Sequence, residues 1–336
     1  MGRVCSSITV LIGLMACTEG GATEDVALDA AAAGSVQVDA GVEPELDART
    51  PDEPEALTSI QVGELVFQAR VAGPEDGVPV LLLHGFPQTS MQWRAQIEAL
   101  AGAGYRVVAP DQRGYSPGAR PRDVESYRAL LLAQDAIGIA DALHWTRFHL
   151  VGHDWGAGIA WIVGVIAPQR LLSIVPISVP HPDGFAKARA VPDSCQAAAS
   201  TYMQDLIAAD AEARVLAADA AWLRRAYRGL PDSLVETYVE LFTDEALLTP
   251  TVNWYRANFG PDVVRVELGP VRVPTLYIWS DADEAVCRES AELARNYVDA
   301  PYQFEILEGV AHWVPELASE RLNRLLLEHL QTHGAP

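Results

Sequence analysis

The sequence predicts an α/β protein in which a mostly parallel sheet is flanked by helices and a helical lid is inserted in the second half. Short apolar runs alternate with segments of helical periodicity, and this alternation is typical of a parallel sheet covered on both faces. Residues 183–261 interrupt the alternation with helical composition and no convincing strand, after which strand-like runs resume. A glycine-flanked pentapeptide at residues 152–156 lies where a buried run meets a helix start.

The N-terminal residues 1–17 have the features of a bacterial lipoprotein signal peptide. A short basic start precedes an apolar run at residues 4–15, which is too short to span a bilayer as a helix. Leu14-Met15-Ala16-Cys17 resembles a lipobox, in which the cysteine is lipidated. We therefore expect an exported protein anchored to the bacterial cell envelope through Cys17, with a soluble secreted or periplasmic protein as the alternative.

Residues 18–57 have the composition of a disordered acidic linker. Eleven acidic residues stand against one basic residue, Arg49, and no aromatic residue is present. Such a segment cannot bury enough apolar surface to offset its ordering entropy. It supplies about half of the formal net charge of −21. The acidity therefore indicates a solvated spacer, and the absence of a basic patch argues against a nucleic-acid partner.

The remaining chain is long enough for one large domain with an insertion. We expect the core domain at residues 58–182 and 262–336 and the lid at 183–261. Strands are expected at 65–71, 78–83, 105–109, 148–151, 172–177, 275–279 and 303–307. Helical segments are expected at 92–101, 127–142, 222–227, 233–242 and 251–259.

Residues Gly152-His153-Asp154-Trp155-Gly156 have the spacing of the G-x-S-x-G nucleophile elbow, with a carboxylate at the serine position. The two small residues let the turn between strand and helix close without side-chain clash. A serine alkylated at saturated carbon would be a stable ether, whereas an alkylated carboxylate is an ester that water can cleave. Asp154 therefore indicates attack on epoxides or haloalkanes. The alternative is an aspartate that only caps the following helix.

Four motifs occur in one order along the chain, and together they resemble the α/β-hydrolase superfamily, within it the epoxide hydrolase branch. The resemblance covers residues 57–330. The motifs are His84-Gly85-Phe86-Pro87, Asp111-Gln112-Arg113-Gly114-Tyr115-Ser116, Gly152-His153-Asp154-Trp155-Gly156 and Asn253-Trp254-Tyr255-Arg256.

The resemblance implies a triad of nucleophile, acid and histidine in that chain order. His312 matches the family's histidine and would activate the water that cleaves the ester. The family pattern G-x-x-D assigns the acid to Asp283. Ser280 replaces the glycine of that pattern, so Asp281 stays an alternative. If Asp281 is not the acid, we expect it to stabilise the turn. The other histidines outside the motifs are expected at the surface or in loops, and these are His144, His149, His181, His329 and His333.

The resemblance also implies donors for developing negative charge. The backbone N–H groups of Phe86 and Trp155 would form the oxyanion hole. Two lid tyrosines protonate the opened epoxide in this family. Tyr255 matches one position, and Tyr202 fits the other although its surroundings depart from the family. The plain alternative for each tyrosine is packing in the lid, which is how we interpret Tyr227 and Tyr238.

The sequence thus predicts a hydrolase that opens a small apolar epoxide to a vicinal diol, with no cofactor and no metal. A haloalkane dehalogenase, which would use Asp154, His312 and an indole N–H from Trp155, is the nearest alternative. A non-catalytic binding protein of the same fold is a further one. Cys195 and Cys287 can form a disulfide or stay as free thiols.

Overall fold

The structure, a computed structural model, describes residues 57–334. The signal peptide and lipidated Cys17 predicted at the N-terminus lie outside the described residues, as does all but the last residue of the predicted linker. Among the described residues, no helix is long and apolar enough to cross a membrane.

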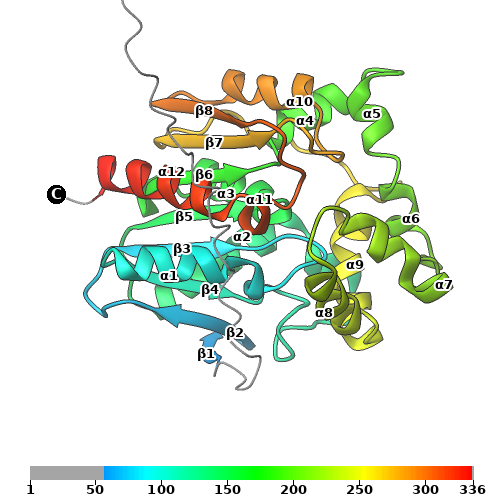
Figure 1. Cartoon of the computed structure of the whole chain (residues 1–336), viewed down its shortest axis with the longest axis horizontal. Helices are drawn as coiled ribbons and strands as arrows, with labels where there is room; N and C mark the ends of the chain where they lie inside the picture. The colour runs from blue at the N-terminus through cyan, green and yellow to red at the C-terminus, as the bar shows by residue number, and fades with distance from the viewer. Residues whose placement is uncertain (1–56, 335–336) are drawn as a thin grey trace, which may run out of the picture. The chain divides into compact units, whose positions relative to one another are not determined.

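Within residues 57–334 the core is an eight-stranded sheet of order β1-β2-β4-β3-β5-β6-β7-β8 (Figure 1). β1 pairs with β2 and β2 with β4 in antiparallel register, and all later neighbours run parallel. The predicted mostly parallel α/β fold is confirmed. The strands are β1 (Thr58–Val62), β2 (Leu65–Ala72), β3 (Pro79–Leu83), β4 (Arg106–Pro110), β5 (Phe148–His153), β6 (Leu171–Ile177), β7 (Thr275–Ser280) and β8 (Tyr302–Leu307).

β1 was not expected from the sequence, and its burial explains why. Only Ile60 of this edge strand is buried, so the strand carries little of the apolar signal that identified the others. By contrast, every residue of β5, β6 and β7 is buried, as parallel strands covered on both faces require.

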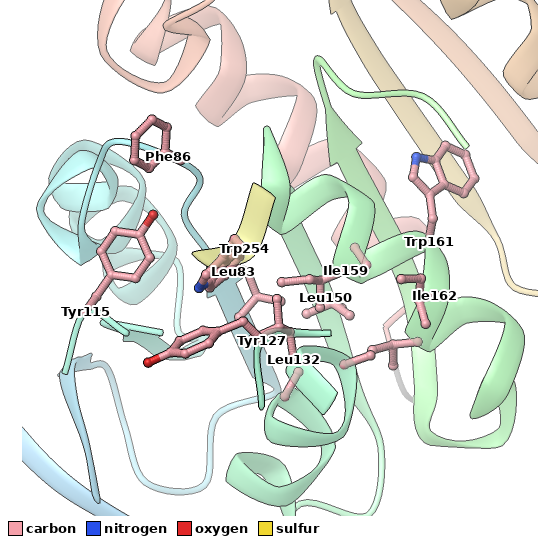
Figure 2. Packing of buried hydrophobic residues seen from close by; sticks show 14 of the residues in the cluster. Leu83, Phe86, Tyr115, Tyr127, Leu132, Leu150, Ile159, Trp161, Ile162 and Trp254 are labelled. Atoms are coloured by element: carbon pink, nitrogen blue, oxygen red, sulfur yellow. The ribbon is translucent and has the colours of Figure 1, made fainter. Parts of the chain in front are cut away.

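Helices cover both faces of the sheet, and alternate residues of β3 show the division. Leu81 and Leu83 pack in a cluster with residues of α2 and α3, whereas Val80 and Leu82 pack with residues of α1 and α12. Figure 2 shows part of the first cluster, in which Leu83, Leu150 and Ile159 lie together. The helices of the core are α1 (Arg94–Gly102), α2 (Ala129–Ala142), α3 (Trp155–Ile166), α10 (Arg288–Leu293), α11 (Val314–Leu317) and α12 (Ser319–Thr332).

Between β6 and β7 the described chain forms the helices α4 to α9, which we call the helical insertion (Figure 1). They are α4 (Pro182–Arg189), α5 (Cys195–Ala199), α6 (Met203–Ile207), α7 (Ala211–Ala226), α8 (Asp232–Phe242) and α9 (Glu245–Phe259). The backbone of α7 leaves helical geometry at residues 217–220. A disulfide between Cys195 and Cys287 joins the start of α5 to the residue before α10, which decides the pairing that the sequence left open.

Candidate active site

Asp154 is the single residue between the end of β5 and the start of α3, and its backbone is strained. Its φ of 53° is rare for a residue with a side chain and costs free energy that the surrounding structure must supply. The flanking glycines are sterically required here: a Cβ on Gly152 would lie 2.1 Å from the carbonyl oxygen of Gly156, and one on Gly156 would lie 2.0 Å from that of Leu83. The turn therefore closes tightly and presents the carboxylate beyond the sheet.

Asp283 and His312 reach the same edge because they follow β7 and β8, whose carboxyl ends lie beside that of β5 through β6. Oδ2 of Asp283 lies 2.9 Å from Nδ1 of His312, and Nε2 of the same ring lies 3.7 Å from Oδ2 of Asp154. Asp281 instead accepts a hydrogen bond of 2.6 Å from the backbone N–H of Gly309. Of the two candidate acids, Asp283 is the one in contact with the histidine.

Ser178 is a member of this site that the sequence analysis missed. Its hydroxyl donates to Oδ2 of Asp283 at 2.7 Å and lies 3.2 Å from Nδ1 of His312. Its φ of 72° lies in the left-handed region, directly after β6. A buried polar residue with positive φ at the end of a buried strand is a structural signal, but the sequence around Ser178 carries no motif that identifies it.

Charge within the site favours an ion pair. Burial acts to lower the pKa of His312, but the carboxylates of Asp283 and Asp154 outweigh it and raise that pKa to about 9. Burial also acts to raise the pKa of Asp283. The charge of His312, together with hydrogen bonds from His312, Ser178 and the backbone of Ala285, outweighs burial and holds that pKa below its ordinary value. The pKa of Asp154 is raised, chiefly by burial, against the charge of His312.

A backbone donor faces one oxygen of the Asp154 carboxylate. The N–H of Phe86, in the turn after β3, donates to Oδ1 at 2.8 Å. A backbone hydrogen bond from Trp155 also acts on this carboxylate. Gly85 makes the approach possible, because a Cβ there would lie 2.3 Å from Oδ1. The structure therefore brings both predicted oxyanion donors to the nucleophile position.

A cavity of about 930 Å³ lies between this edge of the core and the helical insertion. Asp154, His312, Phe86, Tyr202 and Tyr255 all line it. Tyr255 comes from α9 and Tyr202 from the residue before α6, and their rings meet edge to face with centroids 6.2 Å apart. The structure thus brings together every residue predicted for the site, with Trp155 packed edge-on against Tyr255 at 5.2 Å rather than among the cavity-lining residues.

Three of the histidines expected at the surface or in loops are buried. That expectation was wrong for His149 in β5 and His329 in α12, whereas His181 does lie in the loop between β6 and α4. His149 and His181 are fully buried and His329 is 6% exposed. Two of them make contacts that the local sequence does not show: the ring of His149 is hydrogen-bonded to Ser173, and that of His181 stacks on Tyr297. Among residues 57–334 no group of three or more histidine, cysteine or acidic side chains is arranged to hold a metal ion.

Comparison with known proteins gives the relatives of this chain. Residues 78–318 match the family model described as alpha/beta hydrolase fold. Epoxide hydrolase A of Mycobacterium tuberculosis is 32% identical over 77% of this chain and 92% of its own length. The AB hydrolase superfamily protein YfhM of Bacillus subtilis is 30% identical over 81% and 96%. A solved epoxide hydrolase from metagenomes of hot environments is 25% identical with a TM-score of 0.74, covering 83% of this chain and 99% of its own.

Proposed function

We propose that this hydrolase, which belongs to the alpha/beta hydrolase family, opens an epoxide to a vicinal diol through an alkyl ester on Asp154. The observation that carries the proposal is the shared cavity, which is lined by the buried Tyr255, the half-buried Tyr202 and a carboxylate on a strained turn. Similarity to an epoxide hydrolase at 32% identity supports the same conclusion.

In the first step an oxygen of Asp154 attacks a ring carbon of the epoxide and the carbon–oxygen bond of the ring breaks. The released oxygen is an alkoxide, which is far more basic than a phenolate and takes a proton from a phenol. Burial raises the pKa of Tyr255 well above its ordinary value, and the charge of Asp154 adds to this effect. Burial raises the pKa of Tyr202 as well, so both tyrosines stay protonated and available as donors.

In the second step His312 takes a proton from a water molecule, which attacks the carbonyl carbon of the ester. The N–H groups of Phe86 and Trp155 stabilise the oxyanion of the tetrahedral intermediate. The tetrahedral intermediate then collapses and expels the diol as an alkoxide, which takes the proton from His312. Asp154 is regenerated as a carboxylic acid. The proton that this acid then releases replaces the one that the tyrosine gave up.

Alkylation itself makes His312 a better base. The charge of Asp154 helps to raise the pKa of His312, and an ester carries no charge. The first step therefore removes one of the effects that keep the imidazole protonated. Asp283 still orients the ring through its contact with Nδ1.

A single turnover in ¹⁸O-labelled water tests the ester. The first diol should carry unlabelled oxygen from Asp154, and His312→Gln should let the ester accumulate as a mass adduct on the Asp154 peptide. Label in the diol of the first turnover would instead mean direct attack by water and would overturn the covalent mechanism.

The dehalogenase alternative makes a different prediction at the same site. It needs the indole N–H of Trp155 to face a departing halide, whereas a side-chain hydrogen bond from Trp155 acts on Tyr255. A panel of epoxides and haloalkanes scored for diol and for halide separates the two activities. Halide release faster than diol formation would favour the dehalogenase.

A further inference from the structure

Two tyrosines of the helical insertion, Tyr227 and Tyr238, pack in the buried core as the sequence predicted, and their hydroxyls also donate hydrogen bonds. Tyr227, directly after α7, and Tyr238, in α8, are both fully buried. The hydroxyl of Tyr227 donates to the carbonyl oxygen of Pro87, and that of Tyr238 donates to Oε1 of Glu316 at 3.1 Å. Their rings stack with centroids 5.3 Å apart, so the two phenols act as one unit.

These contacts converge on the turn that presents Phe86. Pro87 has no N–H, so its carbonyl is the backbone group through which neighbours can hold it. Gln88, the next residue, donates two hydrogen bonds. Its side-chain amide donates to Oε1 of Glu316, and its backbone N–H donates to the carbonyl oxygen of Gly85 at 3.1 Å. The turn is therefore held on one side by Tyr227 and on the other by Glu316.

The half-buried Glu316 accepts two hydrogen bonds in this arrangement. Its Oε1 accepts one hydrogen bond from the hydroxyl of Tyr238 and one from the side-chain amide of Gln88. In the described part of the chain, Oε2 of Glu316 and Oε1 of Gln88 are buried without a hydrogen-bond partner. Burial raises the pKa of Glu316 to about 8, so its carboxyl is protonated at neutral pH. A proton on Oε2 makes this oxygen a hydrogen-bond donor, and Oε1 of Gln88 is an acceptor without another partner.

We propose that Tyr227, Tyr238 and Glu316 are positioning residues that hold the turn at residues 85–88, so that the N–H of Phe86 stays aimed at Asp154. An oxyanion donor is effective only within about 3 Å of the oxygen that becomes charged, and a shift of about 1 Å can cost about 100-fold in rate. The seating of α7 and α8 on the core thereby sets the oxyanion site. The kinetic consequence rests on the proposed ester mechanism.

The effect should fall on one chemical step. The oxyanion forms when the ester is hydrolysed, whereas charge leaves the Asp154 carboxylate during alkylation. We therefore expect Tyr227→Phe and Tyr238→Phe each to slow ester hydrolysis by roughly 10-fold and to change alkylation by less than about 3-fold. Glu316→Gln keeps an acceptor and a donor and should behave as wild type, whereas Glu316→Met should resemble the tyrosine variants.

Tyr127→Phe is the matched control, because Tyr127 is also fully buried and its hydroxyl also donates to a proline carbonyl, that of Pro121 at 2.7 Å. Single turnovers of styrene oxide, quenched and read as ester on the Asp154 peptide, give both rates. Hydrolysis at the rate of Tyr127→Phe, or an equal fall in both steps, would overturn the inference.

Amide exchange gives a readout that needs no chemistry. In the Tyr227 and Tyr238 variants the amides of residues 84–93 should exchange faster than in Tyr127→Phe, and unchanged exchange would overturn the inference. If the wild type turns over epoxide without forming an ester, the proposed mechanism fails while this measurement still tests how the turn is held.

Discussion

The hydroxyl of Ser178 donates to Oδ2 of Asp283 at 2.7 Å, the same oxygen that contacts Nδ1 of His312 at 2.9 Å. The acid of the site is thus held by two partners from separate strand ends. Backbone N–H groups of Ala285 and Val286 occupy its other oxygen at 2.8 and 3.1 Å. A buried carboxylate with this many donors stays ionised and keeps a single orientation.

Removing the hydroxyl of Ser178 should weaken this support. Ser178→Ala takes one donor from Asp283. We expect ester hydrolysis to slow by roughly 10- to 150-fold, since a hydrogen bond to a charged group contributes about 1.5–3 kcal/mol, while alkylation stays within about 2-fold. Quenched single turnovers measure the two rates. Ser173→Ala is the control, because Ser173 is also buried at β6 and contacts a histidine, His149, outside the site.

Removing the hydroxyl of Tyr255 distinguishes the two reactions at saturated carbon. Tyr255→Phe keeps the ring against Phe86 and Trp155 and deletes only the donor. We expect the alkylation rate with an epoxide to fall roughly 10- to 1000-fold, and the double change with Tyr202→Phe to nearly abolish ring opening. Hydrolysis of ester already formed should be spared. Undiminished epoxide turnover in Tyr255→Phe would argue for the dehalogenase.

The charge of His312 should make stability depend on pH. Its pKa is raised from 6.5 to about 9, so the protonated ring stabilises the folded state. This contribution is fully present below about pH 6.5 and is lost as the pH rises through about 9. The difference in free energy of unfolding between wild type and His312→Gln should therefore shrink over that range in denaturant titrations.

A control separates this effect from general alkaline destabilisation. Tyr127→Phe deletes a buried hydroxyl whose pKa burial raises above its ordinary value, so it removes no charge between pH 6.5 and 9 and its difference from wild type should not change with pH. A His312→Gln difference that is constant or grows from pH 6.5 to 9 would contradict the predicted ion pair.

The disulfide should stabilise the helical insertion against the core. Cys195 and Cys287 are separated by 92 residues, so the bond closes a long loop that contains most of the insertion. We expect Cys195→Ser with Cys287→Ser to lower the free energy of unfolding by about 2–4 kcal/mol. Reductant should destabilise the wild type by the same amount and leave the double variant unchanged. Equal sensitivity of both proteins would contradict the prediction.

Local sterics and apolar patterning were readable from the sequence alone. The pentapeptide around Asp154 carries part of its own turn, because Gly152 is required by a contact with Gly156 inside the motif. Gly156 is required by Leu83 at the end of β3, and only the fold brings that contact about. The buried runs of β5, β6 and β7 identified a parallel sheet, since a strand covered on both faces is apolar throughout. The edge strand β1 escaped detection because only Ile60 is buried.

Partnerships between distant residues were decided only by the tertiary structure. The sequence ranked Asp283 and Asp281 by a family pattern, but which carboxylate reaches His312 depends on how β7 and β8 end beside each other. The hydroxyl of Tyr227 finds Pro87 across 140 residues, and no local pattern encodes that contact. Secondary-structure propensity and apolar periodicity act within one helical turn or one strand, so the sequence alone determined the elements. Hydrogen-bond partners that are distant in sequence meet only when whole elements pack, so the tertiary structure decided them.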